Sequence, residues 1–342
     1  MKKSLLLITF LASAVFAQSH QVIVPVNAAK PVGPYSPGIL TSDYLYVSGQ
    51  GIRDSKNNVP VGVEAQAKQC LENVKAIIEA AGLTMQHVVH MQLYLENLSD
   101  FAAVDQVYVT YFPNQAPARV LLGVAKMPTD TTIEMTAVVV RDLKQKKILN
   151  LKTLKPLGNA SSAVQVGSRV YLSGVYGNTS GEVEAKLKKT LSEVKLKTAN
   201  VVWRNDYGTS IEMRELPNQA KFAASIIASS QAIPKVKNNI CRIEGQTIYC
   251  TAQSGNEAGA KSVEEQVKIV MQKLAAGLAA FGSNFSAVTA SNVYLDDIKE
   301  FKLMNDTYAT FFTNAPPTRT TVQPFLTARQ ALVKISVVAV KE

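Results

Sequence analysis

An internal repeat constrains this chain more than any other feature. Residues 82–119 and 282–319 align without a gap at an offset of 200, and the match continues from 133–141 into 333–341. Identical residues recur across the first pair of segments: Gly82, Val88, Tyr94, Leu95, Phe101, Tyr108, Thr110, Phe112, Asn114, Pro117 and Arg119 reappear as Gly282, Val288, Tyr294, Leu295, Phe301, Tyr308, Thr310, Phe312, Asn314, Pro317 and Arg319. A repeat of this length indicates two copies of one folded unit.

A third, more divergent copy lies between these two. Residues 30–49 match 155–174 at an offset of 125, and residues 87–94 then match 200–207 at an offset of 113. The middle copy has therefore lost about 12 residues between its first and third strands. Its end, residues 208–235, shows neither an arginine turn nor a clear pair of closing strands.

We therefore divide the chain into a leader and three units. The predicted boundaries are a signal peptide at 1–17, a complete unit at 22–145, an eroded unit at 150–235 and a second complete unit at 236–342.

The order of elements within a complete unit follows from hydrophobic periodicity. TSDYLYVSG (41–49) and HVVHMQLYL (87–95) have strand composition. Apolar residues recur at helical spacing in 63–81, and Gly82 is a natural helix stop. A second helix at 101–112 and strands at 118–125 and 131–140 complete the unit. The pattern is β-β-α-β-α-β-β, which predicts an α+β fold with two helices on one face of an antiparallel-rich sheet.

The first residues are typical of a secretion signal. Lys2 and Lys3 precede an apolar run from Leu5 to Phe16, and small residues suit a cut after Ala17. The run is too short for a stable membrane anchor. We therefore expect a periplasmic or secreted protein that does not contact the membrane once the signal is removed.

The net charge and the few histidines and cysteines exclude some classes of partner. The formal net charge is +10, and bases cluster in 141–155 and 186–197 without interleaved aromatics. We interpret these clusters as solvated surface and expect no nucleic-acid partner. Three histidines and three cysteines show no metal-ligand spacing, so no metal site is expected. Cys241 and Cys250 flank a turn-like IEGQ, and whether they form a disulfide stays open.

Several motifs in a fixed order then suggest a family. GPYS (33–36), YVSGQ (46–50), LENVKAIIEAAG (71–82), the PAR turn at 117–119 and the IE pair at 133–134 together resemble the RidA family, also called YjgF. The resemblance implies a chorismate-mutase-like α+β unit that forms trimers, with a site in each cleft between neighbours. It also implies hydrolysis of reactive enamine and imine intermediates to 2-keto acids and ammonia, without a metal or organic cofactor.

The resemblance also implies a set of site residues in the first unit. Arg119 would anchor the substrate carboxylate, since a guanidinium binds a carboxylate bidentately. Glu134, expected on a neighbouring strand, would position or activate water, and Tyr35 would close the cleft. Backbone groups near Ser48 and Gly49 would line its floor. The structural alternative is an Arg119–Glu134 ion pair on adjacent strands.

Departures from the family pattern complicate that assignment. Asp105 stands where the family usually has asparagine, and its carboxylate would repel a carboxylate substrate. The last unit keeps Asn305 and Arg319, but Lys334 replaces the glutamate, so a site built on Arg319 alone is expected to bind rather than hydrolyse. The middle unit has no arginine turn, and Asn159 and Ala160 stand where GPYS has proline and tyrosine.

The duplicated arginine suggests that one chain imitates the family's trimer. We hypothesise that three units close a pseudo-threefold ring, the alternative being a homo-oligomer. One cleft would combine Arg119 and Glu134 with Asn305, and another would pair Arg319 with Tyr35.

Three functions remain open from the sequence. The first is an exported imine deaminase, the second a non-catalytic binding protein for small carboxylates or keto acids, and the third, a minor one, an endoribonuclease.

Overall fold

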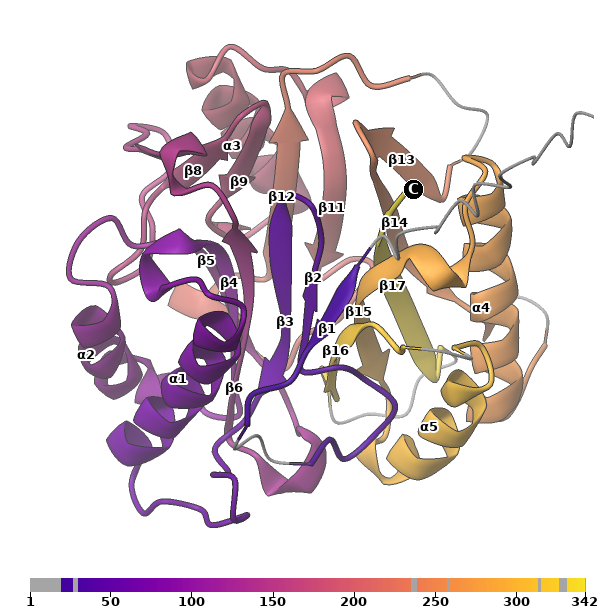
Figure 1. Ribbon diagram of the computed structural model, residues 1–342. Helices are drawn as coiled ribbons and strands as arrows, with labels where there is room; N and C mark the ends of the chain where they lie inside the picture. Colours follow the sequence, from indigo (N-terminus) through magenta and orange to yellow (C-terminus); the bar gives the residue numbers. More distant parts are fainter. Residues whose placement is uncertain are drawn as a thin grey trace, which may run out of the picture.

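The computed structural model describes residues 20–26, 30–234, 239–256, 259–312, 315–325 and 331–341. The expected signal peptide at 1–17 lies outside the described residues, as do Asn314 of the repeat and Asn238, which stands in the last unit near the position that Tyr35 has in the first. The helices and strands form three α+β units in chain order, and Figure 1 shows the strands in the middle of the molecule with the helices outside them. No helix in the described ranges is long and apolar enough to cross a membrane.

The first unit has a six-stranded sheet covered by two helices. Its strand order is β1-β2-β3-β6-β4-β5, and only the β4–β5 pair is parallel. The strands are β1 (Gln21–Ile23), β2 (Gly38–Leu40), β3 (Tyr44–Gln50), β4 (Val88–Leu95), β5 (Ala118–Gly123) and β6 (Ile133–Val140). The helices are α1 (Val63–Ala80) and α2 (Phe101–Tyr111). From β2 onward the element order is the predicted β-β-α-β-α-β-β.

The last unit repeats this arrangement. Its sheet has the order β13-β14-β17-β15-β16, again with one parallel pair, β15–β16. The strands are β13 (Cys241–Glu244), β14 (Thr247–Ser254), β15 (Val288–Leu295), β16 (Thr318–Val322) and β17 (Val333–Val340), and the helices are α4 (Val263–Ala279) and α5 (Phe301–Ala309).

The middle unit keeps the sheet but loses a helix and a strand. Its strands are β7 (Lys146–Leu149), β8 (Ala163–Val166), β9 (Arg169–Leu172), β10 (Val175–Gly177), β11 (Val201–Tyr207) and β12 (Phe222–Ser229), with one α-helix, α3 (Ser180–Glu193). As expected, the described residues of 208–235 form no pair of closing strands, but they do form one closing strand, β12, which pairs with β9, β10 and β11. The counterparts of α2 and β5 are absent from the described residues between β11 and β12, so this unit has no arginine-bearing strand.

Helix burial follows the periodicity that the sequence shows. In α1 the buried positions are Ala67, Cys70, Leu71, Val74, Ile77 and Ile78. Gly82 and Gly282 end the two equivalent helical segments with φ of 73° and 67°, a left-handed conformation that glycine adopts without strain. Each complete unit thereby has its own core between helices and sheet.

The three sheets contact one another in a cycle. Strand β16 packs on β3, β5 packs on β9, and β11 packs on β14, so that each unit contacts both others. Tyr46, Tyr171 and Tyr249 occupy equivalent register positions opposite Val138, Ile227 and Val338. These three tyrosines share one buried cluster with the only tryptophan, Trp203. The sheets therefore meet on a common central core.

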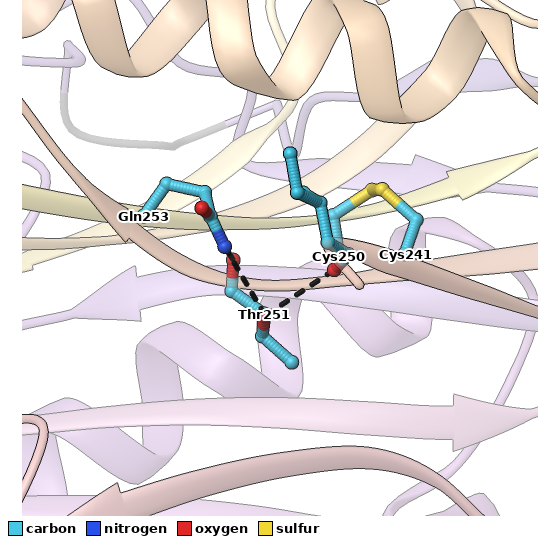
Figure 2. The surroundings of a disulfide bond; sticks show 5 residues. Cys241, Cys250, Thr251 and Gln253 are labelled. Carbon is cyan, nitrogen blue, oxygen red and sulfur yellow. Dashed lines mark hydrogen bonds between the residues drawn. A yellow bond between two sulfur atoms is a disulfide. The ribbon is translucent and has the colours of Figure 1, made fainter. Parts of the chain in front are cut away.

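The cysteine pair left open by the sequence forms a disulfide. Cys241 and Cys250 lie directly opposite each other across the β13–β14 hairpin and are bonded, as Figure 2 shows. Cys70 is free and buried in the first core.

Candidate active site

The two repeated arginines have different surroundings, although both are 4% exposed. Arg119 on β5 is neutralised by its own unit, because its Nη2 lies 2.7 Å from Asp105 Oδ1. The same nitrogen donates to the Leu157 carbonyl at 2.8 Å, although its Nη1 has no partner among the described residues. Asp105 is therefore not a repelling charge in an open cleft, as the sequence suggested, but the counter-ion of Arg119.

The middle unit closes the space around the Arg119–Asp105 pair. The backbone N–H of Asn159 donates to Asp105 Oδ2 at 2.9 Å, and Gly158, with φ of 55°, packs so closely that a side chain there would overlap the Asp105 carboxylate. Tyr176 hydrogen-bonds both backbone groups of Leu121 through its hydroxyl, at 2.8 and 3.0 Å. The cleft between the first and middle units is thus filled by protein groups.

The expected Arg119–Glu134 partnership is wrong in both of its forms. Strand β4 lies between β5 and β6, so the two residues are not on neighbouring strands. The carboxylate of Glu134 instead accepts a hydrogen bond from the Thr320 hydroxyl of the last unit. The reason is how the units pack. The arginine-bearing strand of the last unit, β16, packs against β3 of the first unit, so Thr320 on β16 reaches Glu134.

Arg319 on β16 lies at the junction between the last and first units. Its guanidinium lies 5.6 Å from the Tyr35 ring, 5.6 Å from the Phe301 ring and 5.1 Å from the Tyr308 ring. In the described part of the chain it forms no ion pair, and its buried Nη1 has no hydrogen-bond partner. Burial lowers the pKa of Arg319 below that of a free guanidinium, but arginine stays charged.

Asn305 and the Tyr35 loop complete the surroundings of this arginine. A side chain on Gly33 would lie 2.6 Å from Arg319 Nη2 and 2.9 Å from Asn305 Nδ2, so only glycine lets the loop approach. The Ser36 hydroxyl donates to the Pro316 carbonyl at 2.6 Å and the Ser36 N–H to the Pro317 carbonyl at 3.0 Å. These bonds hold the loop of the first unit on the arginine turn of the last.

Glu134 supplies the acidic group of the same junction. It is 8% exposed, and the backbone of Gly49 passes so close that a side chain there would overlap the carboxylate. Burial raises the pKa of Glu134 to about 7, although the Thr320 hydrogen bond and the charge of Arg319 both oppose the rise. A carboxyl group with this pKa exchanges protons near neutral pH.

A pocket of about 140 Å³ joins these groups, and Arg319, Glu134, Tyr35, Gly49 and Phe301 are among its lining residues. Ser48 is not among the lining residues; it is buried, and its hydroxyl accepts a hydrogen bond from Gln50 Nε2 at 2.7 Å. Asn305 is not among the lining residues, but its amide and Arg319 both lie next to Gly33. Glu134 and Asn305, which were expected beside Arg119, are therefore both near Arg319 instead, and the expected pairing of Arg319 with Tyr35 is present.

The sequence suggested that the Arg319 site lacks an acidic group, because Lys334 replaces the glutamate in the last unit. The pocket nevertheless contains one, since Glu134 comes from the first unit. Lys334 instead donates to the Ser210 carbonyl at the junction of the middle and last units. Thr320 and Phe301 were not anticipated as neighbours of the site. Thr320 is next to Arg319 in the sequence, and Phe301 begins the preceding helix α5, so both could have been expected near this arginine. Which residues of the first unit they contact depends on how the units pack.

Comparison with known proteins identifies the family. A model described as Endoribonuclease L-PSP matches residues 26–141 and 223–341, which is more than half of the chain. The chain belongs to the endoribonuclease L-PSP (RidA/YjgF) family. The resemblance found in the sequence is thereby confirmed, as is the repeated fold of RidA-type units.

Individual relatives in this family each correspond to about one unit. The RutC family protein SSO3206 of Saccharolobus solfataricus is 43% identical over 120 residues, 34% of this chain and 95% of the relative. The 2-iminobutanoate/2-iminopropanoate deaminase of Escherichia coli K12 is 38% identical over 125 residues, 35% of this chain and 98% of the relative. The solved structure of E. coli TdcF with bound serine is 33% identical, with a TM-score of 0.35, and covers 36% of this chain and 99% of its own.

Proposed function

We propose that this protein hydrolyses 2-imino acids, and their enamine tautomers, to 2-keto acids and ammonia in the pocket between its first and last units. The observation that carries the proposal is a buried arginine that forms no ion pair with any described residue, in the same pocket as a buried carboxyl group whose pKa is about 7. Membership of the family and the similarity to a protein named 2-iminobutanoate/2-iminopropanoate deaminase support the reaction class.

Substrate binding follows from the unpaired charge. The carboxylate of a 2-imino acid would accept hydrogen bonds from Arg319, whose side chain makes none to the described residues. The Tyr35, Phe301 and Tyr308 rings around the guanidinium restrict its orientation and exclude water. Because Arg319 is already desolvated, a bound carboxylate recovers more interaction energy there than at an exposed arginine.

Catalysis would use Glu134 as a proton carrier. In its ionised form Glu134 accepts a proton from water as the water oxygen bonds to C2 of the imine. In its protonated form it returns that proton to the nitrogen as the C2=N double bond becomes a single bond, which gives a carbinolamine. Glu134 then takes the proton of the new C2 hydroxyl and passes it to the amine as the C2–N bond breaks, so that the C2=O group forms and ammonia leaves. No oxidation or reduction occurs. A pKa of about 7 populates both forms at neutral pH, which suits a group that serves first as base and then as acid.

Arg119 then has a structural role. Its charge is satisfied by Asp105 within the first unit, and groups of the middle unit cover the pair. We therefore propose one working site per chain, at Arg319.

The cyclic contacts between the three sheets support a one-chain counterpart of a trimer. We also propose export, for which the leader sequence and the Cys241–Cys250 disulfide are the supporting observations, since structural disulfides persist in oxidising compartments.

The test is imine hydrolysis with imino acids generated in situ by an L-amino acid oxidase. Purified mature protein should accelerate keto-acid formation, and Arg319→Gln and Glu134→Gln should each lower the rate at least about 100-fold. The matched control is the double variant Arg119→Gln, Asp105→Asn, which replaces the closed ion pair by neutral amides and should keep the activity.

Two results would change the assignment. Activity that is lost in the control but kept in Arg319→Gln would move the site to the other cleft. No acceleration by a folded protein that binds 2-keto acids through Arg319 would favour the non-catalytic binding protein. The endoribonuclease has less support, because none of the described residues that line the pocket is a histidine.

A further inference from the structure

The pocket contains a second arginine that the proposed hydrolysis does not use. Arg53, in the loop after β3, lines the pocket together with Arg319 and Glu134. Its Nη2 donates to the Thr129 carbonyl at 3.0 Å and its Nη1 to the Asn57 carbonyl at 3.3 Å. Arg53 forms no ion pair with any described residue, although a guanidinium offers five donors. It is thus oriented by carbonyl groups and keeps an uncompensated charge.

The backbone around Arg53 is held in place from two sides. Asn73 on α1 donates through Nδ2 to the Arg53 carbonyl at 2.8 Å and to the Gly51 carbonyl at 3.0 Å. The adjacent carboxylate, Asp54, is occupied by the turn that follows, where it accepts from the N–H groups of Lys56 and Asn58 at 2.9 and 2.8 Å. Asp54 is therefore not the counter-ion of Arg53.

The charges that line the pocket are strongly unbalanced. Lys30, Arg53 and Arg319 are positive, and Glu134 is the only acidic group among the described residues that line it. The net charge of the lining is +2 when Glu134 is ionised and +3 when it is protonated, by addition of these four groups. A substrate with one negative charge would leave at least one positive charge of the lining unbalanced, whereas a substrate with two negative charges would balance the net charge of +2.

The equivalent positions in the other two units carry no charge. Gln50, Val175 and Gln253 are equivalent, because each pairs with the matching residue of the closing strand in its own unit, namely Met135, Ala224 and Ile335. The residues three positions after them in the sequence are therefore also equivalent. These are Arg53, Asn178 and Asn256. The extra cation therefore occurs only in the unit whose pocket contains the unpaired Arg319.

We propose that the preferred substrates are 2-imino acids with a second carboxylate at the end of a short side chain, such as the imines of aspartate and glutamate. Arg319 would bind the carboxylate next to the imine, and Arg53 the side-chain carboxylate. Lys30 adds to the attraction at long range. This inference rests on the proposed hydrolysis, and it adds a specificity-determining residue to that site.

A binding experiment separates specificity from turnover. Isothermal titration of the full mature chain with 2-oxoglutarate and with 2-oxobutanoate, both keto-acid products, should show the dicarboxylate binding at least about 10-fold more tightly. Arg53→Gln should remove most of this preference, and Arg53→Lys should keep part of it. Arg141→Gln is the matched control, since Arg141 also donates to two backbone carbonyls, at 3.2 Å each, but does not line the pocket.

The catalytic arm compares imines of glutamate and methionine, whose side chains have similar lengths. The wild-type protein should show the higher kcat/KM for the glutamate imine, and Arg53→Gln should lower that value at least about 10-fold more than the value for the methionine imine. Equal losses for both imines, or no preference in the wild type, would overturn this inference while Arg319-dependent hydrolysis still stood. The absence of hydrolysis and of Arg319-dependent keto-acid binding would overturn the proposed function as well.

Discussion

Replacing Glu134 by glutamine should stabilise the protein at alkaline pH while abolishing its activity. The pKa of Glu134 is about 7 in the folded protein, against a usual value of 4.5. Below pH 4.5 the carboxyl is protonated in the folded and unfolded states, so its titration does not affect stability. Between pH 4.5 and 7 the unfolded state loses its proton first, and the free energy of unfolding falls as pH rises. Above pH 7 the loss is complete.

The size of this loss follows from the shift. A difference of about 2.5 pH units, at 1.36 kcal/mol per unit, corresponds to about 3 kcal/mol. Glu134→Gln is neutral at every pH and still accepts the hydrogen bond from Thr320. The variant should therefore match the wild type at pH 4 and exceed its free energy of unfolding by about 3 kcal/mol at pH 8.5. Its kcat/KM should fall at least about 100-fold.

Urea unfolding at several pH values measures this difference. The fluorescence of Trp203, the only tryptophan, reports on the central core, and circular dichroism provides a second probe. Glu64→Gln is the control, because Glu64 is exposed on the first turn of α1 and should change stability by less than about 1 kcal/mol. If the stabilities of wild type and Glu134→Gln stay parallel from pH 4 to 8.5, the pKa of Glu134 is not raised and the proton-carrier role loses its physical basis.

The remaining predictions concern the pocket floor, the disulfide and the assembly. Gly49→Ala should lower kcat/KM at least about 10-fold without unfolding the protein, because its methyl group would displace the Glu134 carboxylate; unchanged activity would contradict the close approach. Cys241→Ala, Cys250→Ala should lower the free energy of unfolding by about 2–3 kcal/mol, measured by denaturant titration, since the bond closes a loop with a sequence separation of 9; stability equal to that of the wild type would contradict this. Size-exclusion chromatography with light scattering should give a monomer of this 37.0 kDa chain, less its leader, whereas a trimer would refute the one-chain ring.

Much of the fold was predictable because it depends on local pattern. The periodicity of α1 and α4, the glycines that end them and the strand composition of β3 and β6 are properties of contiguous sequence, and the offsets of the repeat identified the units. The closing strand β12 was missed because the loss of the preceding helix and strand removed the landmarks that mark it in the other units. The residue types of the site were predictable for the same reason, since the motifs around Tyr35, Glu134 and Arg319 are local.

Which of these residues meet was decided by the tertiary structure alone. The sequence determined that the chain has two equivalent arginines, but a short-range pattern treats Arg119 and Arg319 alike. The packing of β16 on β3 brings Arg319 to Glu134 and Tyr35, whereas the middle unit presents Asn159 and Tyr176 to the other cleft. Asp105 then pairs with Arg119, while Asn305, being neutral, forms no ion pair with Arg319, which has none with any other described residue. A single carboxylate and the order in which the units pack therefore separate a closed ion pair from an open anion site.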